Sequence, residues 1–529
     1  MTTQPVNPTP QRRYRRAATL ASIGLIGALV LAGCSVAETS SSESTTTAST
    51  AALVDGALTA DTIMADNDDA TTVNDDEWSA SDAVEVTLNG STASSSSSAV
   101  STESGTVTIS AAGVYRLSGT LDGQVVVAAP DDALVVLILD GATITSSTGA
   151  AIDVQSADDV AISLAEGTQN SLESTASFGD ADVNAVLFSE HDLTISGTGS
   201  LAVSGGDNDG ITSEDDLVIL SGTIAVEADD DALRGKDSLT ISGGTISLTA
   251  GGDALKADNE EEAGRGWVLL EGGSLTATAG DDGIDAWTDI VITGGDTAIT
   301  ATGDGMHSET ILHIEGGTTT VLDSDEGLES SLVSITGGEV DVTAADDAVN
   351  GSGASSTAGG TEQATSDLVR IDGGTIVLTS GADGIDSNGS VLITGGATLV
   401  QSGQQPESIV DANGAITIEG GTLLGLGALG QGVTIDDASL GRTVSAAATG
   451  AAGSVVQVMS AEGAVLVEAT AAQSFTAVLA STDAVSDGAS YSISVDGTAT
   501  TATAGSAIEG MGGAPGGTGG APGGPGSRP

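Results

Sequence analysis

The chain has 529 residues, with 12 Lys and Arg against 74 Asp and Glu. Four of the basic residues lie in the first 34 positions, so the remainder carries eight against the same 74 acids, a net charge of −66. This charge repels phosphate backbones, which argues against nucleic-acid binding and predicts cationic partners such as metal ions. Hydrophobic residues make up 39% and recur in a pattern, so the acidity does not indicate disorder. With 75 glycines and few aromatics, the composition favours a thin, repetitive β structure.

The N-terminus resembles a lipoprotein signal peptide. Arginines at 12, 13, 15 and 16 precede an apolar run at 17–31, and Leu31-Ala32-Gly33-Cys34 follows as a lipobox. The run of about 15 residues is short for a membrane span, although a membrane anchor with a chance cysteine is the alternative. We therefore expect a signal peptide over 1–33 and lipidation of Cys34. The protein would sit on the extracellular face of the cytoplasmic membrane, held only by this lipid anchor.

Next to this leader and at the far end, the composition changes to low complexity. Residues 34–75 begin as a run of Ser, Thr and Ala, and residues 501–529 end in Gly and Pro. Such segments bury too little apolar surface to fold. They predict a polar tether over 34–75 and a disordered tail over 501–529.

Between these ends lies a repeat marked by Gly-Gly pairs, as in ISGGTISLTA (241–250) and ITGGDTAITA (292–301). Successive pairs are 29, 22, 22, 21, 36, 22 and 25 residues apart, so the period is about 22, with insertions at 258–265 and 351–366. Each unit holds three short segments of alternating polarity, which predict strands that need stacking neighbours to bury their cores. We predict an all-β fold, a right-handed parallel β-helix over 76–435 with rungs about 4.8 Å apart. The period stops downstream, where residues 436–500 predict a small antiparallel β module.

An acidic turn opens each repeat unit. The register places eight acids in one column, one per rung, where each neighbouring pair at about 5 Å would repel by about 3 kcal/mol. Raised pKa values, hydrogen bonds from turn N–H groups, or bound cations would relieve this repulsion. All-oxygen ligands favour Ca²⁺, whereas a purely structural Asx turn is the alternative. Doubled acids favour calcium, because a single carboxylate suffices for a turn. The predicted metal residues are Asp209, Asp230, Asp231, Asp253, Asp281, Asp282, Asp304, Asp325, Glu326, Asp346, Asp347 and Asp383.

A second column lies three residues further along each unit and should face outward as a surface strip. Its members are Thr212, Arg234, Lys256, Asp285, His307, Glu329, Asn350 and Asp386. An extended sugar chain could lie along this strip, with basic groups meeting its carboxylates and calcium bridging acids on both sides. Charge pairing that relieves the acidic column is the alternative interpretation. The predicted ligand-binding residues are Arg234, Lys236, Lys256, Asp285, Trp287 and His307.

Several motifs together resemble a bacterial family of carbohydrate-binding parallel β-helix proteins. They are VTISAAGVYRLSG (107–119), LILDGATITSS (137–147) and AEGTQN (165–170), followed by the repeated Asp-Gly-Ile and Gly-Gly-Thr-Ile units. The resemblance covers roughly residues 75–500. It implies a calcium-bearing β-helix that binds acidic polysaccharides such as polygalacturonate, or cellulose. It also implies an architecture similar to pectate lyases, which use calcium and a basic residue to abstract a proton. Lys256 or Arg234 would take that role by position alone. The family is regarded as binding rather than cleaving.

Three functions follow from these expectations. The first is a monomeric, non-catalytic, calcium-dependent protein that binds acidic polysaccharides at the cell surface. The second is a calcium-dependent polysaccharide lyase of the pectate type. The third is a structural stalk or adhesin without a saccharide ligand.

Overall fold

The computed structural model describes residues 58–178, 183–205, 207–353, 364–404, 406–429 and 435–506, all within one compact unit that spans Thr50–Pro529. The predicted signal peptide, Cys34, the first part of the tether and most of the tail lie outside the described residues. Within them, no helix has the length and apolar character that crossing a membrane requires.

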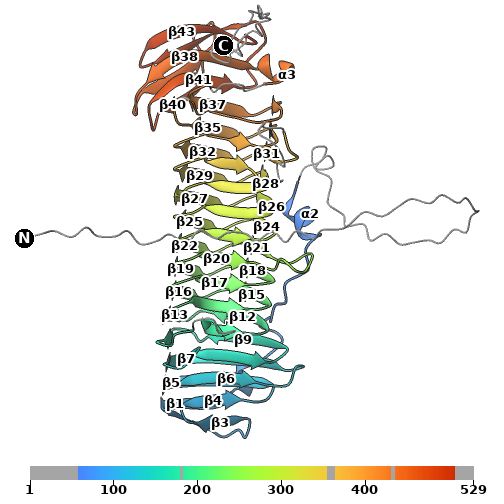
Figure 1. Ribbon diagram of the computed structural model, residues 1–529, viewed down its shortest axis with the longest axis vertical. Helices are drawn as coiled ribbons and strands as arrows, with labels where there is room; N and C mark the ends of the chain where they lie inside the picture. The colour runs from blue at the N-terminus through green and yellow to red at the C-terminus, as the bar shows by residue number, and fades with distance from the viewer. Residues whose placement is uncertain are drawn as a thin grey trace, which may run out of the picture. The chain divides into compact units, whose positions relative to one another are not determined.

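The predicted parallel β-helix is confirmed. Successive strands stack in parallel along three series, and the rungs follow the chain from β4 to β37 (Figure 1). The first series consists of β4 (Thr106–Ile109), β6 (Gln124–Ala128), β8 (Ile152–Ser156), β11 (Ala185–Ser189), β14 (Asp209–Ser213), β17 (Leu233–Gly235), β20 (Leu255–Ala257), β23 (Ile284–Ala286), the first parts of β26 (Met306–Ile314) and β28 (Leu328–Ile335), β30 (Val349–Gly351) and β33 (Asp386–Ser387).

The other two series complete each rung. The second consists of the first parts of β5 (Gly113–Asp122) and β7 (Leu134–Ser146), then β9 (Asp159–Leu164), β12 (Asp192–Gly197), β15 (Asp216–Ile219), β18 (Ser238–Ile241), β21 (Trp267–Leu270), β24 (Asp289–Ile292), the second parts of β26 and β28, β31 (Leu368–Ile371), β34 (Ser390–Ile393) and β36 (Ile416–Ile418). The third runs through β10 (Gln169–Ser174), β13 (Ser200–Gly205), β16 (Thr223–Glu227), β19 (Thr245–Thr249), β22 (Ser274–Thr278), β25 (Asp296–Thr300), β27 (Thr318–Asp323), β29 (Glu339–Ala344), β32 (Thr375–Ser380), β35 (Ala397–Gln401) and β37 (Thr422–Gly427).

The Gly-Gly turn explains why the sequence repeats so strictly. In the third series inward residues such as Ile224, Ile246 and Leu275 stack on one another, and the intervening residues are exposed. The turn before each such strand packs directly on the turn below. A Cβ at Gly273, whose φ is +82°, would lie 2.8 Å from the carbonyl oxygen of Gly244. Only glycine fits there, because both the positive φ and the close backbone approach exclude a side chain.

The segment expected to end the tether is instead part of the folded unit. Residues 58–78, called here the N-terminal strap, lie along the outer surface of the second series. Around α2 (Ala60–Met64), Leu58 and Ile63 pack on Val291 and neighbouring apolar residues, and further along Val73 packs on Val136. The prediction of a tether over 34–75 was therefore wrong for residues 58–75. Strap residues bury apolar side chains that the second series turns outward, which offsets the entropy of ordering them.

Both ends of the stack are covered by antiparallel strands. After a short 3₁₀ turn at Ala80–Asp82, β1 (Val84–Gly90) pairs with β2 (Thr92–Ser95), and β3 (Val100–Glu103) pairs with β4. At the other end α3 (Asp437–Leu440) precedes the expected module, in which β41 joins β37 and β38 and a separate four-stranded sheet follows. These caps remove the exposed edge that an open β-helix would present. The module consists of β38 (Thr443–Gly450), β39 (Val455–Met459), β40 (Val465–Thr470), β41 (Phe475–Ser481), β42 (Ser490–Val495) and β43 (Thr498–Thr503).

Candidate functional site

The acidic turns form a hydrogen-bonded column along the first series, called here the acid ladder. Six of the ladder acids accept the backbone N–H of the acid one rung further on, so these carboxylates cap the next turn. The N···O distances are 3.3 Å from Asp231 to Asp209, 2.8 Å from Asp253 to Asp231, 2.9 Å from Asp282 to Asp253, 2.6 Å from Asp304 to Asp282, 3.2 Å from Glu326 to Asp304 and 2.7 Å from Asp383 to Asp347. The acids therefore have the turn-capping role that the sequence analysis gave as the alternative to calcium binding.

These hydrogen bonds do not remove the electrostatic repulsion between the carboxylates of the ladder. Burial, together with neighbouring acids, raises the pKa of Asp282 and of Asp347 to about 7 and that of Asp383 to about 8. The backbone N–H bonds act in the opposite direction but do not outweigh burial. A ladder without cations therefore keeps part of its carboxyls protonated near neutral pH.

The outward strip has the predicted register. Strand pairing joins Arg234 to Lys256, Lys256 to Asp285, Asp285 to His307 and His307 to Glu329 on consecutive rungs. The same column begins at Thr212 and continues through Asn350 to Asp386. The prediction that the whole column faces outward was wrong at Thr212 and Asn350, which are buried. Because the strip lies beside the acid ladder, its side chains decide how the ladder charge is balanced.

In residues 209–258, called here the ion-paired half, basic side chains form ion pairs with the ladder, although burial still raises the pKa of Asp209 to about 6 and that of Asp231 to about 7. Lys256 Nζ lies 2.6 Å from Asp253 Oδ2 and 3.2 Å from Asp231 Oδ2. Arg234 contacts Glu214 at 2.8 Å and Asp258 at 3.0 Å. Although burial opposes it, the neighbouring carboxylates raise the pKa of Lys256 and of Arg234 well above the usual range. The charge pairing considered for these residues is thus present, and neither group is suited to act as a general base.

Lys236 and Trp287 flank the strip. Lys236 Nζ is 3.4 Å from Glu214 Oε2 and its side chain is 36% exposed. Trp287 is the more exposed of the two tryptophans in the repeat, at 41%, whereas Trp267 is buried. Trp287 follows Asp285 by two residues and is thus placed beside the strip, where its ring is available to solvent.

Residues 282–411, called here the acidic half, contain Arg370 as their single Lys or Arg. Arg370 lies on the second series, where its Nε donates to Asp372 at 2.6 Å, away from the ladder. The cation nearest the ladder is His307, whose Nδ1 lies 3.0 Å from Asp285 Oδ1. That contact raises the pKa of His307 to about 9, so the ring is charged at neutral pH.

Four groups of side chains bring three potential ligand atoms within 4.8 Å of one another in the described residues. Two consist of carboxylates in the acidic half, which are the oxygen ligands that Ca²⁺ prefers. A third includes protonated His307, and the fourth lies next to Lys256 and Arg234. The groups are Asp304, Glu326 and Glu329; Asp383, Asp386 and Asp411; Asp282, Asp285 and His307; and Asp209, Asp230 and Asp231.

The group around Glu326, called here the central cluster, has two further properties of a cation site. Burial and the Asp304 carboxylate raise the pKa of Glu329 to about 7, and burial also raises the pKa of Asp304. A divalent cation between these acids would relieve their mutual repulsion. Asn350 donates to Glu326 Oε2 at 2.6 Å, while its buried Oδ1 has no hydrogen-bond partner. An unsatisfied amide oxygen beside carboxylates completes an all-oxygen donor set.

The structure brings together only some of the predicted metal residues. Asp281, Asp325 and Asp346, the first acids of their doublets, are absent from all four groups, and all three are exposed at the turn. Asp253 and Asp347 are absent from the groups as well. The preference for doubled acids therefore has geometric support only at Asp230. The groups instead include Glu329 and Asp386, which sequence reasoning placed on the strip but not among the ligands. Asp411 was missed, because it lies in an irregular segment without a repeat signal.

Comparisons with known proteins find similarity over part of the chain. A family model described as "Carbohydrate-binding domain-containing protein" matches residues 103–367. A curated relative from Acetivibrio thermocellus, also described as "Carbohydrate-binding domain-containing protein", is 39% identical over 128 residues. That match covers 23% of this chain and 45% of the relative, less than half of its length. A solved structure of a polysaccharide lyase-like protein from C. thermocellum, in a gadolinium derivative, is 35% identical with a TM-score of 0.43; the match covers 44% of this chain and 96% of that one.

Proposed function

This chain belongs to the carbohydrate-binding domain-containing family, and from that premise we propose that it is a non-catalytic, calcium-dependent receptor for acidic polysaccharides. The observation that carries the proposal is the run of carboxylate groups at strip and ladder positions of successive rungs. A linear glycan and a β-helix both repeat along one axis, so a strip of equally spaced sites can engage many sugar units at once.

Calcium would be held by the carboxylate groups of the acidic half. The central cluster and the group of Asp383, Asp386 and Asp411 offer carboxylate oxygens in a half whose single Lys or Arg is Arg370. When bound there, the ion supplies positive charge that attracts the carboxylates of a glycan to an otherwise repulsive surface. The protein carboxylates orient the ion, and the ladder hydrogen bonds fix the turns that carry them.

The basic side chains of the ion-paired half would contribute to binding rather than to catalysis. A lyase of the pectate type needs a neutral base near the substrate. Lys256 and Arg234 are held in their charged forms by two acids each. Charged groups of this kind can still donate hydrogen bonds to sugar hydroxyls and carboxylates. Exposed Trp287 would offer a ring face to a bound sugar.

Affinity electrophoresis through polygalacturonate tests the proposal. We expect retardation in calcium that is abolished by EGTA. Glu329→Gln should weaken it by at least tenfold, whereas Asp325→Asn, a neighbouring acid outside the central cluster, should not. Accumulation of unsaturated products in the same mixture would support the lyase instead. Absence of retardation by every acidic polysaccharide tried would support a stalk or adhesin.

For the location of the protein, we propose export and lipid anchoring at Cys34, with the protein otherwise monomeric and without membrane contact. The proposal is supported by the lipobox at Leu31-Ala32-Gly33-Cys34. Cys34→Ala should release the protein from the membrane fraction. Retention of the variant in that fraction would contradict the lipid anchor.

A further inference from the structure

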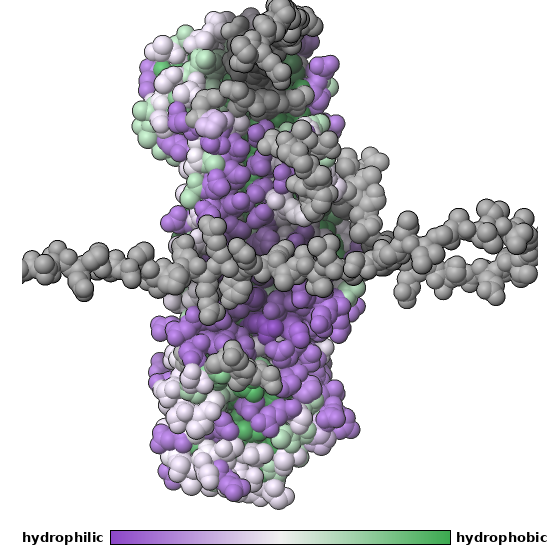
Figure 2. Space-filling view, in the orientation of Figure 1, coloured by the Kyte–Doolittle hydropathy of each residue, from purple (hydrophilic) through white to green (hydrophobic). Residues whose placement is uncertain are grey.

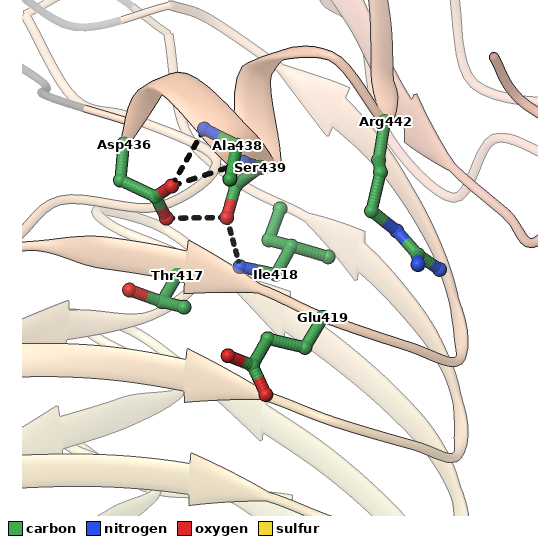
Figure 3. Close-up of a pocket in the computed structure, with 7 residues that line it drawn as sticks. All are labelled: Thr417, Ile418, Glu419, Asp436, Ala438, Ser439 and Arg442. Carbon is green, nitrogen blue, oxygen red and sulfur yellow. Dashed lines mark hydrogen bonds between the residues drawn. The ribbon is translucent and has the colours of Figure 1, made fainter.

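A cavity of about 410 Å³ lies where the last rung of the β-helix meets α3, remote from the acid ladder (Figure 3). It is lined by Thr417, Ile418, Glu419, Asp436, Ala438, Ser439 and Arg442. Its volume falls in the range of small-molecule sites. The residues lie beyond 103–367, the stretch matched by the family model, so the family assigns nothing to this place.

One side of the cavity is a rigid polar wall. The Asp436 carboxylate accepts the backbone N–H groups of Ala438 and Ser439 at 2.9 and 3.0 Å and the hydroxyl of Ser439. Ser439 Oγ in turn accepts the N–H of Ile418 at 2.7 Å, which ties α3 to β36. These bonds outweigh burial and lower the pKa of Asp436. The wall is thus ordered and negatively charged before any ligand arrives.

The other lining groups have hydrogen-bonding capacity to spare. Arg442 Nη2 donates to Asp483 at 2.7 Å, and the Arg442 side chain remains 34% exposed. Glu419 follows β36 and is exposed, and its carboxylate has no hydrogen bond to another described residue. Figure 3 shows Asp436 and Arg442 at opposite ends of the cavity with Glu419 between them. A donor and an acceptor therefore face one space.

The charges select the chemistry of the ligand. Two carboxylates against one guanidinium repel an anion, and the guanidinium disfavours a cation close to it. A neutral hydroxyl group both donates and accepts, so neighbouring hydroxyls can satisfy Glu419 and Arg442 together. Exposed Ala438 supplies apolar surface for the C–H face of a ring. We propose that this cavity binds one neutral sugar unit, independently of calcium and of the strip.

Ligand-observed saturation-transfer NMR on the full chain tests this proposal. The probes are galactose, glucose, mannose and xylose as neutral sugars, galacturonate as an anion and glucosamine as a cation. We expect at least one neutral sugar to bind with a Kd on the order of 1 mM, unchanged by EGTA, and more tightly than either charged probe. Tighter binding of galacturonate than of galactose would overturn the charge argument.

Matched variants locate the binding. Glu419→Gln and Arg442→Gln should each weaken the neutral sugar at least about tenfold, since each removes a charged hydrogen-bonding group. Glu329→Gln in the central cluster should leave it unchanged, and Asp483→Asn should retain binding because it leaves the Arg442 guanidinium in place. If no neutral sugar binds, or if the cavity variants bind as the parent does, the proposal is wrong. These outcomes are separable from polygalacturonate retardation, which should persist in both cavity variants.

Discussion

The two halves of the acid ladder have the same fold and register but different means of balancing charge. In the ion-paired half, Lys256 bridges Asp231 and Asp253, and Arg234 joins Glu214 to Asp258. In the acidic half the equivalent strip positions are mostly acids, with protonated His307 at the boundary. The backbone hydrogen bonds are alike in both. The comparison shows that the β-helix can form with the acid ladder in both halves. The strip side chains determine whether a Lys or Arg of the protein balances the ladder charge or whether a bound metal ion is needed.

Neither half is marked by a simple change in surface polarity. Figure 2 shows hydrophilic residues gathered over the middle rungs, whereas the C-terminal module is paler with more apolar patches. The difference between the halves is therefore one of charge sign at defined strip positions. Substitution of single charged side chains at these strip positions can therefore remove the difference between the halves.

The largest expected effect is that of pH in the absence of calcium. The pKa values of Asp282, Glu326 and Asp347 are raised to about 7 and that of Asp383 to about 8, above the ordinary range near 4. For acids raised in the folded state, the stabilisation is fully present below the unfolded pKa and is lost as pH rises through the folded pKa. We expect unfolding in EGTA to become easier between pH 5 and 8, by roughly 4 kcal/mol after discounting for solvent screening.

Hydrogen exchange would show which half accounts for this loss, because repeat stacks can open locally. Amides of residues 282–353 should lose protection with rising pH more than those of residues 209–258. Equal loss in both halves, or a gain in stability over the same interval, would contradict the distinction.

The next largest effect should come from Lys256→Met, which makes the ion-paired half resemble the acidic one. Removal of the ammonium leaves two mostly buried carboxylates without their cation, a loss of about 3 kcal/mol at pH 8. Calcium or a shift to pH 5 should recover part of it. Lys236→Met is the control, since its 3.4 Å contact is partly exposed and should contribute below about 1 kcal/mol. Chemical denaturation measures the free energy of unfolding of both variants. Equal losses would contradict the proposal that Lys256 balances the charge of the ladder.

Calcium should stabilise the protein through the acidic half. One site filled at a hundredfold excess over its Kd contributes about 2.7 kcal/mol. Glu329→Gln should remove about that contribution while leaving stability in EGTA unchanged or improved, because it replaces a buried acid whose pKa is raised by burial and by Asp304 with a neutral side chain. Thermal melts with and without calcium test this, and an undiminished calcium effect in the variant would exclude the central cluster.

The sequence predicted the ladder and the strip accurately because glycine turns fix the phase of every rung. Once the Gly-Gly pairs are aligned, Arg234, Lys256 and Asp285 must share a column, as strand pairing confirms. The N-terminal strap was missed because it is short and polar. A signal existed in the second series, where runs such as Trp267–Leu270 are apolar on both faces, as strands buried on both sides require. No sequence pattern indicated that Asp411 lies close to Asp383 and Asp386, because this proximity depends on the path of an irregular segment.

The smallest expected effect separates neighbouring acids of one doublet. Asp325 is exposed and outside the central cluster, whereas Glu326 accepts the Asn350 amide and lies within it. Asp325→Asn should change the calcium-dependent melting temperature by the equivalent of less than about 0.5 kcal/mol, as is usual for an exposed surface site. Glu326→Gln in the same assay should remove most of the contribution of that cluster. Because the two residues are adjacent, general loss of charge would affect both variants alike, so a difference between them can only come from coordination geometry. Equal effects of the two substitutions would mean that the overall negative charge of the acidic half attracts calcium without binding it at a defined site.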